Sequence, residues 1–99
     1  MNIDDIRSIS WRFSEYLKQN NLKAMYFIGT KVVVLAELYN AYPEPLSYPA
    51  IAEMHNLHRS NVCRAVNNLE NEQFINRNTS TIELSDDGLA LCEYVFSTD

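Results

Sequence analysis

The sequence is poor in the residues that build phosphate, metal and disulfide sites. It holds two glycines and two cysteines among 99 residues. A Gly-rich loop that cradles phosphates cannot be made from Gly29 and Gly88, which stand far apart. Cys63 and Cys92 lack the CxxC spacing of zinc ligands and provide no disulfide framework. We therefore expect no metal site, no cofactor and no enzymatic activity.

Long apolar runs are also missing. No stretch approaches the roughly 20 residues that a helix needs to cross a bilayer. The first ten residues have neither the basic region nor the apolar core of a signal peptide. With two cysteines that show no pairing pattern, this predicts a reduced, cytoplasmic protein. A hydrophobic content of 46% over 99 residues predicts one compact domain, residues 1–99.

Positive charge is scarce, because 8 basic residues face 13 acidic ones and the net charge is −5. This balance argues against a protein that binds nucleic acid through bulk electrostatics alone. The charges are unevenly distributed, however. Arg59, Arg64 and Arg77 fall within a short region that contains only Glu70 and Glu72 as acids. A neutral-to-basic surface on an acidic body is therefore expected.

That region includes a helix-turn-helix pattern at residues 47–71. Ser47 can cap the first helix, and Pro49 falls near the first helical position, where a missing N–H costs nothing. We expect Met54 on the buried face of this helix. Asn56 is placed at the sharp turn, because asparagine adopts the left-handed conformation more readily than most residues. The spacing is that of two helices joined by a tight turn.

The second helix has an apolar stripe and a polar outer face. The stripe comprises Val62, Ala65, Val66 and Leu69. Asn61, Arg64 and Asn68 recur at helical spacing on the other face, flanked by Ser60 and Asn67. Asparagine can pair bidentately with adenine and arginine with guanine, so this face suits the DNA major groove. An ordinary helical hairpin with a solvated polar face would show the same polarity.

The segment after this helix resembles the winged helix-turn-helix of the multiple-antibiotic-resistance regulator (MarR) family. In that family a Leu-Glu pair closes the recognition helix, a strand ends in Arg, and a second strand precedes a helix that opens with an acidic residue and Gly. This chain keeps that order and spacing. The Leu-Glu pair is Leu69-Glu70, the strand that ends in Arg is 74–77, the second strand is 81–85, and the helix opens at 86–88. The wing, 74–84, departs from the family, because its turn 78–80 is short and carries no Asp-x-Arg.

Flanking helices complete the predicted fold. An amphipathic helix is expected at 3–20, ended by Asn20-Asn21, and another at 86–96, capped by Ser85. We expect residues 22–28 to form a short helix or a connection under the core. We expect a buried helix at 31–42, capped by Thr30, although its three consecutive valines favour a strand locally. The fold class is mainly α with a small two-stranded β wing (α+β).

The resemblance implies a sequence-specific regulator that binds double-stranded DNA, a small dimeric repressor on a palindromic operator. The predicted base-reading residues are Ser60, Asn61, Arg64 and Asn68, and the predicted phosphate-binding residues are Arg59, Arg77 and Lys31. In this family the terminal helices build the dimer, which here implies contacts from Ile6, Trp11, Phe13, Leu89 and Phe96. Trp11 could instead lie across a neighbouring helix of its own chain.

Two further expectations follow. Some members of the family bind small phenolic ligands between the dimer arm and the DNA-binding region, but the arms of this chain are short and we expect no effector. The alternative function is a winged-helix module that contacts a partner protein without binding DNA, for which acidity and a bare wing are no handicap.

Overall fold

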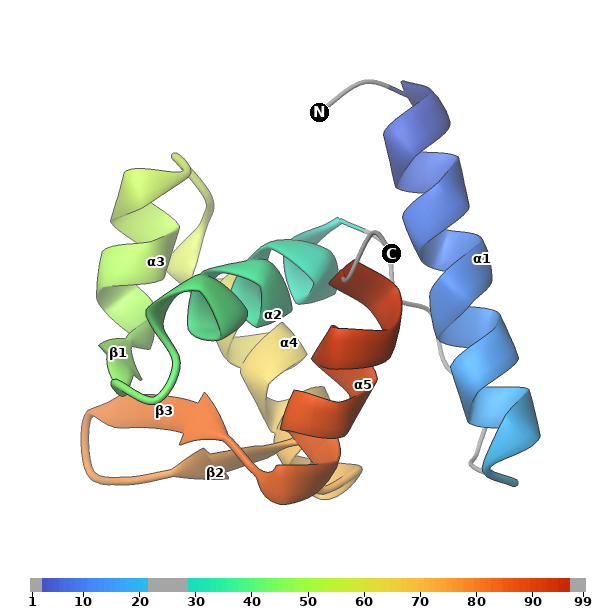
Figure 1. Cartoon of the computed structure of the whole chain (residues 1–99). Helices are drawn as coiled ribbons and strands as arrows, with labels where there is room; N and C mark the ends of the chain where they lie inside the picture. The colour runs from blue at the N-terminus through green and yellow to red at the C-terminus, as the bar shows by residue number, and fades with distance from the viewer. Residues whose placement is uncertain (1–2, 22–28, 97–99) are drawn as a thin grey trace.

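The computed structural model of the chain describes residues 3–21 and 29–96, with side chains described from Trp11 onward. Five helices and a small sheet follow one another along the chain (Figure 1). In chain order they are α1 (Ile3–Gln19), α2 (Thr30–Ala41), β1 (Leu46–Ser47), α3 (Tyr48–Met54), α4 (Arg59–Asn71), β2 (Ile75–Arg77), β3 (Thr81–Leu84) and α5 (Asp86–Phe96). The predicted helix-turn-helix, wing and flanking helices are therefore present, and the segment 22–28 lies outside the described residues.

Helix α2 occupies the centre and packs against α3, α4, α5 and β3. Val34, Leu35 and Leu38 are fully buried in it, and the three valines form a helix as predicted. Because α2 lies between other helices and the sheet, most of its circumference is buried. That burial outweighs the preference of valine for strands. The expected cap by Thr30 is wrong: Gly29 precedes the helix, and no side chain caps it.

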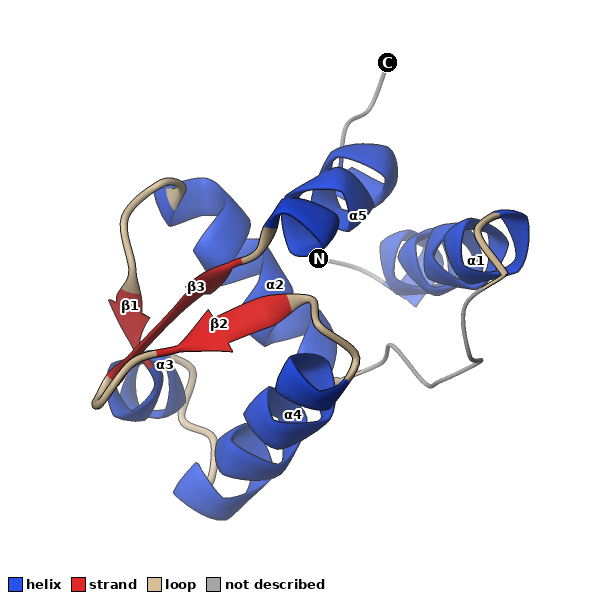
Figure 2. Ribbon diagram, turned by 90° about the horizontal axis from the view of Figure 1, so that it is seen from below, coloured by secondary structure: helices blue, strands red, loops and turns tan. Residues whose placement is uncertain are grey.

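The sheet has three antiparallel strands in the order β1-β3-β2 (Figure 2). Strands β2 and β3 form the predicted wing, whose short turn is closed by the Asn78 N–H donating to the carbonyl of Thr81 at 2.8 Å. The short strand β1 was not predicted. Leu46 and Ser47 pair with Ile82 and Thr81, so the chain leading into α3 is fixed to the wing.

Helix α1 packs along α5 (Figure 1). Phe13 and Leu17 are buried, and the Phe13 ring meets Phe96 edge-on at a centroid distance of 5.9 Å. The Phe96 ring in turn stacks on Tyr39 of α2. The Arg12 guanidinium donates to the Val95 carbonyl at 3.0 Å, where a cation is favourable at the C-terminal end of α5.

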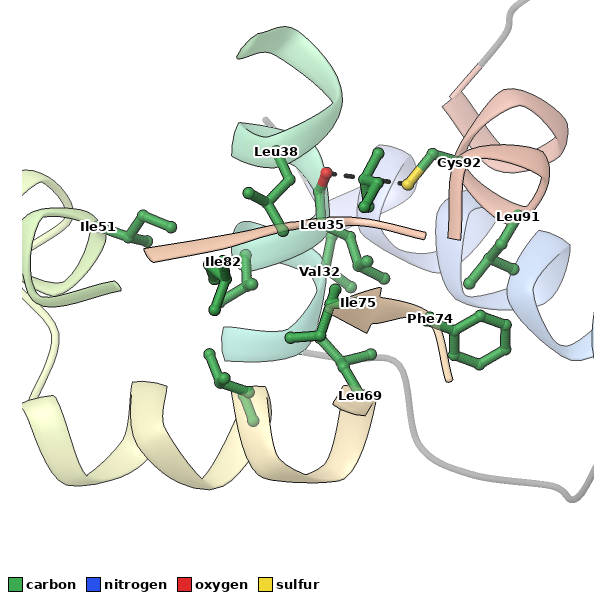
Figure 3. Packing of buried hydrophobic residues seen from close by; sticks show 14 of the residues in the cluster. Val32, Leu35, Leu38, Ile51, Leu69, Phe74, Ile75, Ile82, Leu91 and Cys92 are labelled. Carbon is green, nitrogen blue, oxygen red and sulfur yellow. Dashed lines mark hydrogen bonds between the residues drawn. The ribbon is translucent and has the colours of Figure 1, made fainter. Parts of the chain in front are cut away.

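The core is apolar, and among the described residues no polar or charged side chain is fully buried. Figure 3 shows Phe74 of the α4–β2 connection beside Leu91, and Cys92 directed at the backbone of α2. The Cys92 thiol donates to the Leu35 carbonyl at 3.9 Å. Burial, with a smaller contribution from Glu93, raises the pKa of Cys92 to about 12, so this thiol stays neutral at ordinary pH. No helix within the described residues has the length and apolar character to cross a membrane.

The start of α5 lies very close to the segment that connects α4 to β2. Ser85 caps α5, as predicted, because its hydroxyl accepts from the Gly88 N–H at 3.0 Å. The same hydroxyl donates to the Gln73 carbonyl at 2.6 Å, and the Ser85 N–H donates to the Phe74 carbonyl. A side chain at Gly88 would collide with that Phe74 carbonyl. Glycine at 88 is therefore required by close packing of two backbones.

We predict that Gly88→Ala destabilises the protein by about 1–3 kcal/mol, although alanine favours an isolated helix. Denaturant unfolding measures the change. Gly29→Ala is the comparison without a collision: nothing lies within 4 Å of its added Cβ, so its expected loss of about 1–3 kcal/mol would come only from a φ of 61° and a ψ of −124°, which residues with side chains rarely adopt. A gain in stability for Gly88→Ala would contradict the close packing.

Candidate nucleic-acid interface

The turn between α3 and α4 has the predicted geometry. Asn56 has a φ of 54°, in the left-handed region. Its N–H donates to the Glu53 carbonyl at 3.2 Å, and the Leu57 N–H donates to the Ala52 carbonyl at 2.8 Å. This pair of hydrogen bonds is a Schellman motif, which satisfies the last carbonyls of α3. The chain therefore reverses sharply and sets α4 at an angle to α3.

The first helix of the motif is also capped as expected. The Ser47 hydroxyl accepts from the Ala50 N–H at 3.4 Å, and a proline stands in the first turn. Ile51 is buried, but the prediction for Met54 is wrong, because 63% of its side chain is exposed. Met54 is the last residue of a short helix, and there the chain turns away from the core.

The inner stripe of α4 is completely enclosed. Val62, Val66 and Leu69 are 0% exposed and Ala65 is 4% exposed, packed mainly against α2 and α3. Burying such side chains contributes about 1.5–3 kcal/mol each for valine and leucine. The helix therefore has one preferred rotation about its axis. That rotation determines which residues face outward.

The outward residues of α4 include most of the predicted base-reading residues. Ser60, Asn61 and Arg64 are exposed, and Asn68 is partly exposed. Asn61, Arg64 and Asn68 also line a shallow hollow of about 220 Å³ together with Lys31 and Thr30 from the first turn of α2. The structure thus brings Lys31, predicted to bind phosphate, to the side of α4. Arg59 is exposed at the first residue of the helix.

Arg77, the third predicted phosphate-binding residue, lies on the other side of α4 and is engaged within the chain. Its Nη2 donates to Asn67 Oδ1 at 2.7 Å, and its Nε lies 3.8 Å from Glu70 Oε1. Its guanidinium carbon lies 5.5 Å from the centre of the Tyr48 ring, a cation–π distance. The side chain is 27% exposed. It joins β2 to α4 and α3.

Asn67 is the outward residue that the sequence analysis did not assign. It is exposed and follows Ser60 and Arg64 at i+7 and i+3, which places it on the outermost strip of the helix. The spacing itself could have identified it. Its amide N–H₂ faces Cys63 Sγ, 3.9 Å away, and Cys63 is a partly exposed free thiol.

Some of the acidic residues lie together beside the sheet. An open groove of about 890 Å³ beside the sheet is lined by Glu83, Asp86 and Asp87 as well as by Glu70 and Arg77. Arg59, Arg64 and Lys31 do not line this groove. Within the described residues, no three His, Cys, Asp or Glu side chains are placed to hold a metal ion.

The residues predicted for a dimer interface occupy different environments. Phe13 is 1% exposed and lies inside its own chain, against Phe96. Leu89 and Phe96 are half-buried against the core. Trp11 is 64% exposed on α1, which excludes the interpretation that its ring is covered by a neighbouring helix of the described chain. The side chain of Ile6 lies outside the described residues.

Two helices joined by a left-handed turn, followed by a β hairpin and a further helix, define a winged helix-turn-helix protein. A model of the MarR family matches residues 29–81, which include α2, the whole helix-turn-helix and the first half of the wing. The chain belongs to the MarR family, a family of transcription regulators.

Solved structures show the same fold. A point mutant of MepR from Staphylococcus aureus, bound to an oligodeoxyribonucleotide, is 20% identical with a TM-score of 0.68, over 92% of this chain and 67% of that one. MepR without that mutation, a regulator of the multidrug efflux pump MepA, is 22% identical with a TM-score of 0.64 and the same coverage. A Mycobacterium tuberculosis MarR family protein is 18% identical with a TM-score of 0.63, over 92% of this chain and 64% of that one.

This chain therefore spans about two thirds of the length of those proteins. A comparison with curated proteins gave no match. At these identities the likeness establishes the fold, and the activity of this chain has to be argued from its own surface.

Proposed function

We propose that this chain binds double-stranded DNA in a sequence-specific manner and regulates transcription as a homodimeric repressor. The observation that carries the proposal is α4: its apolar stripe is completely enclosed, and its outer face presents Asn61, Arg64 and Asn68. A rigidly held helix with asparagine and arginine outward is the element that enters a major groove in helix-turn-helix proteins. The MepR mutant bound to an oligodeoxyribonucleotide has the same fold, which supports DNA binding by this chain.

The side chains divide into two groups under this proposal. Ser60, Asn61, Arg64 and Asn68 contact base edges, since asparagine and arginine can make the bidentate pairs that distinguish bases. Arg59 and Lys31 bind phosphates on either side of the groove, because they stand at the start of α4 and of α2. The first backbone N–H groups of these helices add phosphate contacts that carry no full charge.

Two copies of the chain are needed for tight binding. One recognition helix with few cations gives few phosphate contacts, whereas a twofold dimer on a palindrome doubles them and doubles the bases contacted. We place the dimer contact on the outer surface of α1, around Trp11, because an exposed tryptophan is a typical anchor of an interface. A small dimer that covers an operator acts most simply by excluding other proteins from the promoter. We therefore expect it to repress transcription.

The contribution of the outer face can be tested with Asn61→Ala and Arg64→Ala. Each should weaken binding to a selected duplex by about 1–3 kcal/mol and change binding to random DNA little. Fluorescence anisotropy measures both affinities, and circular dichroism checks the fold. Glu93→Ala, an exposed change on α5, is the control that should leave specific binding intact. Equal losses on the two DNAs would contradict base recognition by these residues.

The dimer can be tested by light scattering on the purified protein. At tens of micromolar, a range in which specific interfaces are occupied, we expect a particle of twice the 11.5 kDa chain. Trp11→Glu should convert it to a monomer and weaken DNA binding, because a charge would be buried at the interface centre. Tyr42→Glu changes another exposed aromatic residue, outside α1, and should leave the dimer unchanged. A monomeric wild type would refute this assembly.

A further inference from the structure

Arg77 was expected to bind a DNA phosphate, yet its side chain contacts residues of its own chain. An arginine guanidinium only donates hydrogen bonds. Because Arg77 Nη2 donates to the Asn67 side chain at 2.7 Å, the atom of the Asn67 amide that faces it must be the oxygen, Oδ1. The amide N–H₂ then points the other way, toward Cys63 Sγ at 3.9 Å, which is a weak acceptor. The orientation of the Asn67 amide is therefore set by Arg77.

The guanidinium itself is held on further sides. Glu70 Oε1 lies 3.8 Å from Nε, and the Tyr48 ring lies under the guanidinium carbon at 5.5 Å. Nε is buried and makes no hydrogen bond, so the Glu70 contact is an ion pair at a distance. Glu70 is 41% exposed, and such a pair alone contributes little. Together, the charge, the ring and the short hydrogen bond hold the guanidinium in one plane above α4.

We propose that Arg77 is a positioning residue for base recognition, and that it makes Asn67 a hydrogen-bond donor toward the DNA. The inference rests on the proposed DNA-binding function. Asn67 lies on the outermost strip of α4, between Arg64 and the end of the helix. A free asparagine pairs with adenine by accepting with its oxygen and donating with its nitrogen. Arg77 occupies one lone pair of Oδ1, and one of the two Nδ2 hydrogens faces Cys63. The second Nδ2 hydrogen remains for a base acceptor. O6 of guanine can accept it, whereas the N6–H₂ of adenine is itself a donor.

The proposal makes Arg77 different from a phosphate contact in two measurable ways. A phosphate contact contributes to every duplex alike, and its loss flattens the salt dependence of log K by about 0.9 per contact. A positioning residue changes the preference at one base pair and leaves that slope unchanged. Lysine can replace arginine at a phosphate as a point charge, but it cannot reproduce the planar guanidinium between Asn67, Glu70 and Tyr48.

The experiment begins with selection of binding sites from random duplexes by the wild type and by Asn67→Ala. The base pair at which the two selections differ is the one contacted by Asn67, and we expect the wild type to prefer guanine to adenine there by about tenfold. Arg77→Ala and Arg77→Lys should both lose this preference. Fluorescence anisotropy over a salt series should show the same salt dependence of log K for both Arg77 variants as for the wild type. Arg59→Ala is the matched control and should flatten the slope without changing the base preference.

Three results would overturn the inference while leaving the proposed function intact. The first is a guanine preference that survives Arg77→Ala. The second is a flatter salt dependence of log K for Arg77→Ala that Arg77→Lys restores. The third is selection of identical sites by the wild type and Asn67→Ala. Failure of the wild type to select any duplex would instead refute the proposed function, and with it this inference.

Folding of the variants is checked by thermal unfolding. If both Arg77 variants unfold, Asn67→Asp still tests the part of the proposal in which Asn67 donates to the base. Its carboxylate can accept from Arg77 but has no N–H to donate. It should reject guanine at that base pair, and an unchanged preference would overturn the proposal.

Discussion

Burial of the inner side of α4 is the constraint on which the candidate DNA surface depends. Val62, Val66 and Leu69 leave no exposed area, so the helix cannot rotate without losing several kcal/mol of apolar burial. The left-handed Asn56 sets its start, and the contact of Gly88 with the Phe74 carbonyl fixes the segment that follows its end. A polar outer face on a helix held at both ends needs little reorganisation on binding, which reduces the cost of association.

Charge is arranged around this helix in a way that the overall balance conceals. The chain carries a net charge of −5, yet its acidic groove lies beside the sheet and the start of α5. Arg59, Arg64 and Lys31 stand at α4 or next to it. The proposed DNA binding would therefore depend on base contacts and backbone N–H groups more than on bulk attraction to phosphates. The turn of the wing, residues 78–80, holds no cation, which agrees with a small contribution from phosphate contacts.

Local signals in the sequence were sufficient for two of the helix caps and for the turn of the helix-turn-helix. Ser47, Asn56 and Ser85 each act through hydrogen bonds within a few residues, and their roles follow from the chemistry of caps and turns. The contacts of Arg77 could not be predicted in this way. Its partners Asn67, Glu70 and Tyr48 reach it only because β2 folds back along α4 and β1 fixes the start of α3 to the wing. The strand β1, of two residues, is too short to give a periodic pattern.

The most direct test of the account maps the DNA on the protein by amide chemical shifts. A ¹⁵N-labelled sample is titrated with a selected duplex, and shift changes are assigned along the chain. The account predicts that the largest changes fall on residues 59–68 of α4 and on Thr30 and Lys31 at the start of α2. Residues 86–96 of α5 should change little. Changes centred on the acidic groove around Glu83, Asp86 and Asp87, or no changes at all, would contradict it.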